Sequence, residues 1–476
     1  MLHKDFTGRT KDLLCDEYDE FEASLDMQPH VSIRINPHKP AEAYNDLISD
    51  NTENVQWCKT GRYLPKRPSF TFDPLFHAGT YYVQEASSMF LEQAVNRILT
   101  DTGMTDKQIT ALDLCAAPGG KSTHLQTLLP KGSLLVSNEV IRSRCMILAE
   151  NTAKWGIPDN IVTNNDPKGL GRLANVFDII VADMPCSGEG MFRKDIASRD
   201  EWSVDNVKLC ASRQRRIIHD VWNALKPGGW LIYSTCTFNT EENEENVYTL
   251  ATELGAEIIS IPVNSEWNIT GALCHNIPAY RFFPHRTKGE GFFLALLQKK
   301  GRHTEIKKTK NNIQQATIPG HIKDKLSEPE KFSFYTRKNT AYDSKQPEKQ
   351  QSKHTQETII INAIPTTHDN IYNILSGHTS IISAGVLLGE LKGKDFIPSV
   401  QLAMSTELCR ERFASVELSY EQSIKYLQKE AVILPEDTPT GYILVTFRNA
   451  ALGFVKNIGN RANNLYPQEW RIRNRK

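Results

Sequence analysis

Two cysteines stand in polar turns at the ends of apolar, strand-like runs. Cys186 lies within DMPCSG, after the run 176–183, and Cys236 lies within STCT, at the end of the run 230–236. A thiolate is a strong nucleophile and also a soft metal ligand. We predict no metal here, because no third or fourth Cys or His ligand has suitable local spacing. Both thiols are therefore candidates for covalent chemistry.

The remaining cysteines give no sign of a disulfide framework or a zinc finger. The chain has 9 cysteines, an odd number, spread over 476 residues with no CxxC pair. This usage is typical of a reducing compartment. Apart from Cys115, we interpret the others as small buried hydrophobic side chains: Cys15, Cys58, Cys145, Cys210, Cys274 and Cys409.

A glycine-rich turn joins a strand-like run at 110–117 to an apolar helix ending near Leu129. Its sequence is PGGKS, from 118 to 122. Backbone N–H groups of such a turn and the N-terminus of the helix suit an anionic or carboxylate group of a nucleotide-like ligand. The turn does not match the phosphate-binding loop GxxxxGK[ST], whose first glycine would fall on Cys115, and it does not match GxGxxG. A purely structural strand-to-helix connection is about as common for this turn alone.

An acidic residue stands at or near the end of each of the next three strands. These residues are Glu139, Asp166 and Asp183. Ligands of open α/β sheets bind at the carboxyl ends of the strands, where an acid after the second strand holds a ribose and one after the third suits adenine. Any one of them alone is as well explained as a cap of a helix or turn. Three in order favour a nucleotide-like cofactor.

A thiolate beside a methyl donor suggests one specific reaction. Carbon-5 of a pyrimidine is too weak a nucleophile to take a methyl group until a thiolate adds to carbon-6. A base must then remove the carbon-5 proton so that the thiolate can leave. Protonating or hydrogen-bonding ring N3 helps the first step. Asp183 is placed for that role, with contact to the cofactor as the competing role, and the chemistry alone leaves open which cysteine attacks.

The elements that position these residues alternate between apolar strand-like runs and helices, which indicates an α/β class with a mostly parallel sheet. The runs are 110–117, 132–140, 160–166, 176–183, 230–236 and 291–298, and the helices are 142–155 and 205–225.

The chain divides into four predicted regions. For residues 1–75 the sequence predicts a small α+β region that we assign to RNA recognition. Residues 76–300 predict the catalytic domain, 301–356 a polar basic linker, and 357–476 a β-rich domain with one helix that starts at a Ser419/Gln422 capping box.

Composition narrows the class of protein. Lys plus Arg and Asp plus Glu both number 56, so nucleic-acid binding cannot be argued from net charge and any basic surface must be local. The acidic first thirty residues do not resemble a secretion signal, and the apolar runs are far shorter than a membrane span. We therefore expect a cytoplasmic protein, and we expect it to be a monomer.

Three segments together resemble the Sun-type RNA (cytosine-carbon-5) methyltransferases, and most closely the bacterial small-subunit ribosomal RNA methyltransferase F group. They are LDLCAAPGGK (112–121), DMPCSGEG (183–190) and YSTCT (233–237). Further similarity covers QEASSM (84–89) and RFFPH (281–285). The segment from GFVKN to Trp470 resembles the PUA-like RNA-binding domain that ends this group.

The resemblance implies a Rossmann-like methyltransferase sheet, a small N-terminal domain and a C-terminal PUA-like domain. It implies S-adenosylmethionine as cofactor and small-subunit ribosomal RNA as partner, with a cytosine methylated through a covalent intermediate. It makes Cys236 the nucleophile and Cys186 the residue that assists breakdown of the adduct, and we count Asp183 and Lys121 among the catalytic residues. The cofactor-binding residues that it implies are Cys115, Ala116, Ala117, Pro118, Gly119, Gly120, Lys121, Glu139, Asp166 and Asp183.

Three alternatives remain open at this point. The same chemistry on tRNA, a non-catalytic RNA-binding protein on this scaffold, and a P-loop-like hydrolase each fit part of the pattern. RNA contact is predicted from the basic segment 456–476, with Tyr466 and Trp470 for base stacking. Basic side chains of the central domain are further candidates to line an RNA channel: Arg193, Lys194, Arg213, Arg215 and Arg216.

Overall fold

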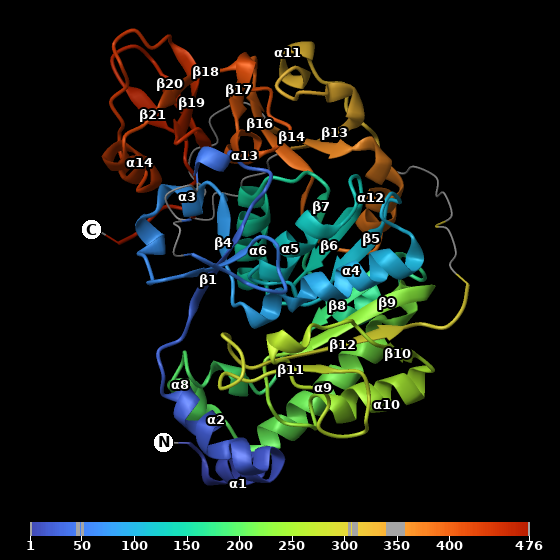
Figure 1. Ribbon diagram of the computed structural model, residues 1–476. Coiled ribbons are helices and arrows are strands. Elements are labelled where there is room, and N and C mark those ends of the chain that lie inside the picture. Colours follow the sequence, from blue (N-terminus) through green and yellow to red (C-terminus); the bar gives the residue numbers. More distant parts are fainter. Residues whose placement is uncertain are drawn as a thin grey trace, which may run out of the picture.

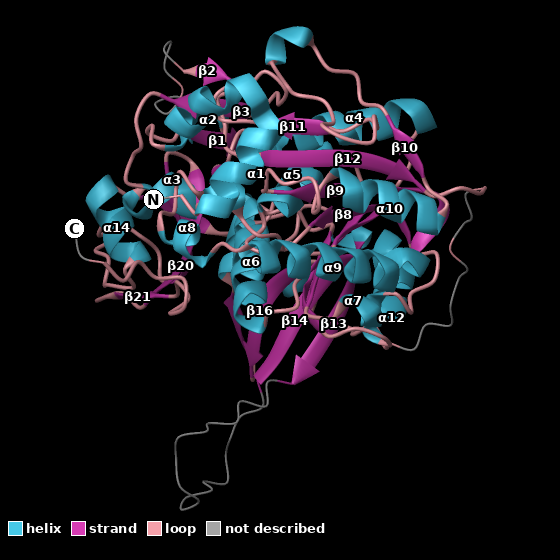
Figure 2. Ribbon diagram, turned by 90° about the horizontal axis from the view of Figure 1, so that it is seen from below, coloured by secondary structure: helices cyan, strands magenta, loops and turns pink. Residues whose placement is uncertain are grey.

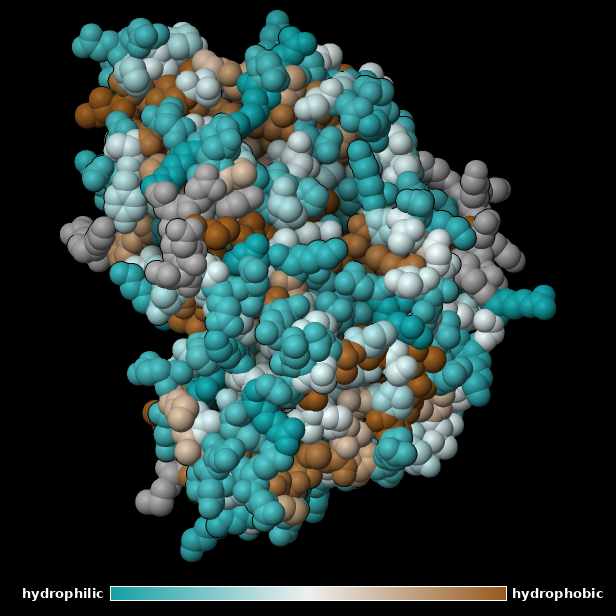
Figure 3. All heavy atoms as spheres, viewed as in Figure 1, coloured by the Kyte–Doolittle hydropathy of each residue, from teal (hydrophilic) through white to brown (hydrophobic). Residues whose placement is uncertain are grey.

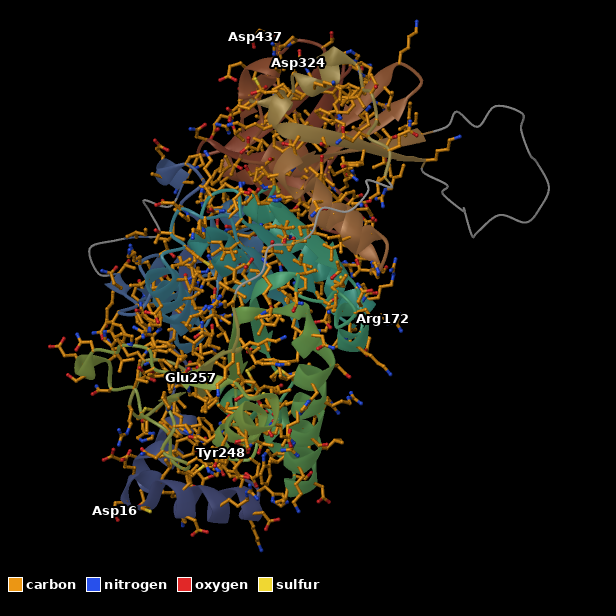
Figure 4. All side chains as sticks on the ribbon, turned by 90° about the vertical axis from the view of Figure 1, so that its right-hand side faces the viewer. Asp16, Arg172, Tyr248, Glu257, Asp324 and Asp437 are labelled. Carbon is orange, nitrogen blue, oxygen red and sulfur yellow. The ribbon has the colours of Figure 1, made fainter. Side chains whose placement is uncertain are left out.

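The computed structural model describes residues 2–43, 48, 52–302, 306, 313–338 and 358–474. The molecule has a central α/β body, with N-terminal helices at one end and C-terminal sheets at the other (Figure 1). In Figure 4, Asp16 lies at the end with the N-terminal helices, and Asp324 and Asp437 lie at the opposite end. Within the described residues, none of the helices is long and apolar enough to cross a membrane.

The central sheet has the strand order β10-β12-β9-β8-β5-β6-β7-β15, and β11 pairs with β12. The strands from β9 to β7 are parallel, whereas β12 and β15 run antiparallel to their neighbours. The middle strands are continuous apolar runs because both of their faces are covered. Their bounds are β5 Thr110–Asp113, β6 Leu134–Asn138, β7 Asn160–Thr163, β8 Phe177–Asp183, β9 Leu225–Thr235, β10 Glu257–Ile259, β11 Tyr280–Phe282, β12 Phe292–Gln298 and β15 Ile381–Ala384.

Helices cover both faces of this sheet. On one face, α4 and α5 pack against a cluster that includes Leu125 and Ile179. On the other face, α7, α9 and α10 pack against a cluster that includes Ile218 and Leu250. These helices are α4 Leu91–Thr102, α5 Gly120–Leu128, α6 Arg142–Trp155, α7 Pro167–Leu170, α9 Val204–Val221 and α10 Glu244–Leu254. The short helix α8 (Ala197–Glu201) lies instead beside α2, near the N-terminal helices (Figure 1). The layers place the carboxyl ends of β5 to β9 along one edge.

The N-terminal region divides into a helical part and a small sheet. Helices α1 (Lys4–Leu14) and α2 (Tyr18–Leu25) pack on the central domain beside Phe192 and Phe238. The sheet has the order β2-β3-β1-β4, and it continues past the predicted boundary at 75. The elements are β1 Val31–Ile35, β2 Glu53–Asn54, β3 Gly61–Leu64, α3 Pro74–His77 and β4 Tyr81–Val83.

The C-terminal region contains two four-stranded sheets rather than one β-rich unit. One has the order β13-β14-β16-β17 and projects from the body in Figure 2, and the other has the order β18-β19-β20-β21. The predicted capping box and hairpin are both present, the first at the start of α14 and the second between β19 and β20. The elements are α11 Gly320–Lys323, β13 Phe332–Lys338, β14 Thr358–Pro365, α12 Asp369–Ser376, β16 Val386–Lys392, β17 Asp395–Pro398, α13 Val400–Met404, β18 Ala414–Glu417, α14 Tyr420–Leu427, β19 Gly441–Phe447, β20 Ala450–Asn457 and β21 Ala462–Asn464.

The structure corrects the predicted linker and the boundary that follows it. The range 301–356 contains β13, which pairs along its length with β14, so part of the supposed linker is folded. The buried side chains of Ile322, Phe332 and Phe334 hold this segment against the C-terminal sheets. Moreover, β15 belongs to the central sheet although it lies in the range predicted as the C-terminal domain. The remainder of the linker falls largely outside the described residues.

Candidate active site

The two cysteines singled out in the sequence meet at the edge of the central sheet. Strands β8 and β9 are neighbours, with Asp183 opposite Ser234, so the turns that follow them lie side by side. The Sγ atoms of Cys186 and Cys236 are 3.2 Å apart, and the backbone N–H of Cys236 donates to the Cys186 sulfur at 3.4 Å. Both side chains are half-buried and neither forms a disulfide. Parallel pairing therefore brings two thiols from distant segments of the chain side by side.

The two thiols have different surroundings. The pKa of Cys186 is held well above its ordinary value, first because its thiol is hydrogen-bonded to Cys236 and then because it is buried. A neighbouring carboxylate, Glu242, acts in the same direction. These surroundings therefore favour the protonated form of the Cys186 thiol.

An ion pair lies beside the sulfurs. The Nζ atom of Lys121, at the start of α5, is 2.8 Å from Oδ2 of Asp183, and Ser234 donates to Oδ1 of the same carboxylate at 2.7 Å. Burial lowers the pKa of Lys121, but the charge and hydrogen bond of Asp183 outweigh it, and the net pKa is raised. The charged form of Cys236 also raises this pKa. Lys121 is therefore a permanent cation close to the candidate nucleophile.

Side chains of α6 form hydrogen bonds to the backbone of the glycine turn. Gly119 has φ +116° and forms the N-cap of α5, a conformation that favours glycine. Arg144 donates to the carbonyl of Ala117 at 2.8 Å, and Asn151 donates to the carbonyl of Pro118 at 2.8 Å. These bonds fix the backbone of the turn beside the ion pair.

The three strand-end acids lie along the same edge of the sheet, and two of them also accept a hydrogen bond from the backbone that follows, Asp166 as a helix cap. Glu139 accepts from the N–H of Ile141 at 2.9 Å, just before α6. Asp166 accepts from the N–H of Lys168 at 2.9 Å and is the N-cap of α7. Each of these contacts uses one carboxylate oxygen, so the capping role and a ligand-binding role are compatible. Half-buried Cys115 lies nearby in the turn, and burial raises its pKa.

Asp113 is a buried acid that the sequence analysis did not select. It is the last residue of β5, and it accepts from the hydroxyl of Ser122 at 2.7 Å through Oδ2. Its Oδ1 atom has no hydrogen-bond partner in the part of the chain that the structure describes. Burial raises the pKa of Asp113 to about 7. An acid within an otherwise apolar strand was the signal that could have identified it.

We expect the substitution Asp113→Asn to change how stability depends on pH. Because the folded-state pKa is raised, the stability that protonation of Asp113 contributes is complete below its ordinary pKa and is lost as the pH rises through about 7. Asparagine stays neutral at every pH. The free energy of unfolding of the variant, minus that of the wild type, should therefore rise by about 3 kcal/mol from pH 5 to pH 8. Thermal melts over this range measure it. Parallel wild-type and variant profiles would contradict the assigned protonation.

A second buried acid, Glu189, ties the turn of Cys186 to the turn of Cys236. Its Oε2 atom accepts from the hydroxyl of Thr237 at 2.6 Å and from the N–H groups of Phe238 and Asn239 at 2.7 and 2.9 Å. Its Oε1 atom accepts from the indole of Trp202 at 2.9 Å and from the amide of Asn239 at 3.0 Å. Five donors therefore hold this carboxylate, and through it the backbone after Cys236.

A third buried acid, Glu242, adds hydrogen bonds to the same two turns. It accepts from the N–H of Ser187 at 3.0 Å, from Gln214 at 2.7 Å and from Asn239 at 2.8 Å. Burial raises the pKa of Glu242 to about 6. Glycine is required at position 190, where a Cβ atom would lie 2.9 Å from the carbonyl oxygen of Cys236. The sequence analysis missed Glu189 and Glu242 because their role depends on contacts between two separate turns.

We expect Glu189→Gln to slow turnover without weakening substrate binding. The new amide would face N–H donors where an acceptor is needed, at a cost of about 1–3 kcal/mol in the free energy of unfolding. A displaced Cys236 should lower kcat by about 10- to 100-fold with little change in KM. Steady-state kinetics and thermal melts measure the two effects, and Glu189→Asp, which keeps the charge, should recover part of kcat. An unchanged kcat in Glu189→Gln would show that Glu189 does not position the nucleophile.

Several basic and aromatic residues predicted to contact RNA have structural partners instead. Arg193 is buried and donates to the Glu290 carboxylate at 2.9 and 3.0 Å. Arg215 donates to Asn246 at 2.6 Å. Tyr466 is fully buried in the C-terminal core, so it is unavailable for base stacking. The predictions for Arg193 and Tyr466 are therefore wrong.

The surface seen in Figure 3 is largely polar. Hydrophilic residues cover much of the face seen in Figure 3, with hydrophobic patches between them. In the basic tail, Lys456 is paired with Asp395 at 2.7 Å, and the ring of half-buried Trp470 lies under the Nζ atom of Lys154 at 5.4 Å. Contact of the tail with RNA stays a prediction.

Comparison with protein families gives matches along most of the chain. A family model described as 16S rRNA methyltransferase RsmB/F matches residues 103–298. A model of the N-terminal domain of 16S rRNA methyltransferase RsmF matches residues 2–86, and a model of the methyltransferase RsmF PUA domain matches residues 413–472.

Curated relatives match this chain over most of their length. Ribosomal RNA small subunit methyltransferase F of Aliivibrio salmonicida is 30% identical over 465 residues, which cover 95% of this chain and 93% of the relative. The chain belongs to the ribosomal RNA small subunit methyltransferase F family. The protein of the same description from Aliivibrio fischeri is 29% identical, again with 95% and 93% covered. The resemblance inferred from the three sequence segments is thus confirmed.

Solved structures confirm the fold class of this family member. A methyltransferase homolog protein from Pyrococcus horikoshii is 26% identical with a TM-score of 0.52, covering 62% of this chain and 95% of that chain. NSun6 from the same organism, solved with the S-adenosylmethionine analogue SFG, has a TM-score of 0.53 at 19% identity, covering 63% and 99%. The second likeness concerns the fold alone.

Proposed function

We propose that this protein transfers a methyl group from S-adenosylmethionine to carbon-5 of a cytosine in small-subunit ribosomal RNA. Membership of the family supports the substrate class. The observation that carries the chemistry is the pair of sulfurs 3.2 Å apart beside a buried ammonium group. One thiol is enough to act as the nucleophile. The second thiol is explained if it assists the release of the covalent adduct.

The residues at the edge of the sheet suit S-adenosylmethionine. The glycine turn offers backbone amides, and the strand-end carboxylates offer acceptors for the hydroxyl and amino groups of an adenosine. We assign binding to residues 115–121 together with Glu139, Asp166 and Asp183. When bound, the cofactor supplies an electrophilic methyl group.

Cys236 is the proposed nucleophile. Its thiolate forms a bond to carbon-6 of cytosine, and the electrons of the 5,6 double bond move to carbon-5, which then accepts the methyl group. Lys121, adjacent in space, favours the thiolate electrostatically. A base then removes the proton from carbon-5, and the electrons of that C–H bond re-form the 5,6 double bond as the bond between carbon-6 and sulfur breaks and the Cys236 thiolate leaves.

Cys186 is proposed to assist this last step. Its environment keeps it protonated and directed at the Cys236 sulfur, so its thiol can hydrogen-bond to the sulfur that leaves. Asp183 and Lys121 are proposed to hold the base. The carboxylate accepts from the 4-amino group of cytosine, while the ammonium donates to N3, which makes carbon-6 more electrophilic. The ion pair thus makes Lys121, rather than a neutral Asp183, the donor.

A base within a duplex must be turned out of its stack before it reaches the sulfurs. The RsmF-type N-terminal and PUA domains are the proposed sources of the contacts that offset this cost of a few kcal/mol. We also propose that the enzyme acts as a cytoplasmic monomer.

Bisulfite sequencing of total RNA from cells with and without the gene tests the proposed substrate. Loss of methylation at a cytosine of the small-subunit RNA is the expected result. A loss of cytosine methylation confined to tRNA would show that the substrate is tRNA, and the proposed chemistry would be unaffected. No change in any RNA, together with normal RNA binding by the purified protein, would favour a non-catalytic RNA-binding protein.

A further inference from the structure

A buried cluster of three potential metal ligands lies where the N-terminal region meets α4 and α5. It consists of Cys58 in the turn between β2 and β3, Glu92 at the start of α4, and His124 on α5. The side chain of His124 is 0% exposed and that of Glu92 is 4% exposed, and Cys58 is also buried. The proposed reaction uses none of them.

The donor atoms of the cluster converge on one point. The Nε2 atom of His124 is 3.3 Å from Oε2 of Glu92 and 3.7 Å from Sγ of Cys58, and all three ligand atoms lie within 4.8 Å of one another. The Cys58 thiol is also hydrogen-bonded to Glu92, so each of the three groups faces the other two, and one cation at their centre can bind all three. Ligand atoms at the usual zinc distances stand about 3.3–3.7 Å apart around a tetrahedron. The two measured separations fall within this range.

We propose that Cys58, Glu92 and His124 bind a zinc ion. Sulfur, imidazole nitrogen and carboxylate oxygen are the donors that zinc accepts in tetrahedral sites. The hydroxyl oxygen of half-buried Thr60, 3.8 Å from the Cys58 sulfur, is the neighbouring group that completes the set directly or through water. The backbone N–H of Lys59 donates to Oε1 of Glu92 at 3.2 Å, which orients Oε2 toward the site.

A zinc ion bound here displaces the thiol proton of Cys58, and the resulting thiolate and the Glu92 carboxylate together balance its charge.

The site would connect the N-terminal sheet to the helix that carries the glycine turn. Its ligands come from three elements, and α5 begins at Gly120, next to Lys121. Arg34 makes a similar connection, since its guanidinium donates to the carbonyls of Gly120 at 3.3 Å and Thr123 at 3.4 Å. The ion would therefore be structural, and its binding energy would stabilise the junction of the two domains. The sequence analysis predicted no metal because it considered local spacing alone.

Metal content and cobalt spectroscopy of the full chain test this site. Purified protein loaded with zinc and dialysed into metal-free buffer should retain one ion per chain by mass spectrometry of the elements. Replacement of zinc by Co²⁺ should give a thiolate-to-cobalt charge-transfer band and the d–d bands of a tetrahedral ion. Both signals should be lost in Cys58→Ser. In Glu92→Gln the affinity for the metal ion should fall at least tenfold.

Two controls separate this site from the catalytic sulfurs. The double variant Cys186→Ser/Cys236→Ser should keep the ion and the band, and so should Cys409→Ser, whose cysteine lies elsewhere. If the double variant loses the band and Cys58→Ser keeps it, the metal is at the catalytic pair and the proposal is wrong.

A measurement on the wild type covers the case in which Cys58→Ser does not fold. Zinc should protect Cys58 from alkylation during partial unfolding in urea, as read peptide by peptide by mass spectrometry, while Cys15, which is exposed, reacts equally with and without zinc. Equal alkylation of Cys58 in both conditions, or less than one-tenth of an ion retained per chain, would overturn the proposal.

Discussion

Replacing Cys236 by alanine is expected to abolish methyl transfer and also to prevent any covalent protein–RNA adduct. The physical reason is that carbon-5 of cytosine becomes nucleophilic only after sulfur has added to carbon-6. Loss of an essential nucleophile typically lowers kcat by about 10⁴-fold or more. Transfer of a radiolabelled methyl group to small-subunit RNA measures activity, and denaturing gel electrophoresis detects the adduct.

A cysteine outside the catalytic pair provides the control for this experiment. Cys409→Ala removes a thiol of the C-terminal region, far in the chain from β8 and β9, and should leave turnover unchanged. The assignment would be reversed if Cys236→Ala retained activity while Cys186→Ala formed no adduct. Cys186 would then be the nucleophile, in spite of the hydrogen bond and burial that hold its pKa high.

Replacing Cys186 by alanine is expected to have the opposite effect on the adduct. The Cys236 sulfur should still add to the base, but its release should be slow because the thiol 3.2 Å away no longer assists the leaving sulfur. A covalent complex should therefore accumulate to about one per enzyme in the presence of cofactor and RNA, with turnover reduced by about 10²- to 10⁴-fold. A gel-shifted, denaturant-resistant band measures it.

The double variant Cys186→Ala/Cys236→Ala distinguishes this adduct from tight non-covalent binding. It should bind RNA as the single variants do and show no denaturant-resistant band. Persistence of the band in the double variant would place the covalent bond on another side chain, and an absence of the band in Cys186→Ala would remove the proposed role of Cys186 in release.

The local features of the chain were predictable because local interactions decide them. The helix Arg142–Trp155 begins and ends at the predicted residues, and the strands at 134–138 and 177–183 lie inside the predicted apolar runs. The capping box at Ser419 and the hairpin turn at Arg448 and Asn449, both with positive φ, follow from residues adjacent in sequence.

Contacts between distant segments were decided by the tertiary structure. The strand Phe332–Lys338 lies in a segment that reads as polar linker, and it is stabilised by pairing with β14 rather than by its own composition. Tyr466 is followed by basic residues typical of an RNA-binding tail, yet its ring packs against Tyr426 in the core. Composition describes a segment by itself, and burial depends on what the rest of the chain places against it.

The sequence by itself determined the α/β class, the succession along the chain of the strands that carry the candidate residues, and the two cysteines at strand ends. Only the tertiary structure decided that their sulfurs touch, that Glu189 and Glu242 hold their turns, and that Cys58 meets Glu92 and His124. The physical reason is the range of the interactions. Periodicity and capping act over a few residues, whereas side-chain clusters form when parallel strands and packed helices bring together residues far apart in the chain.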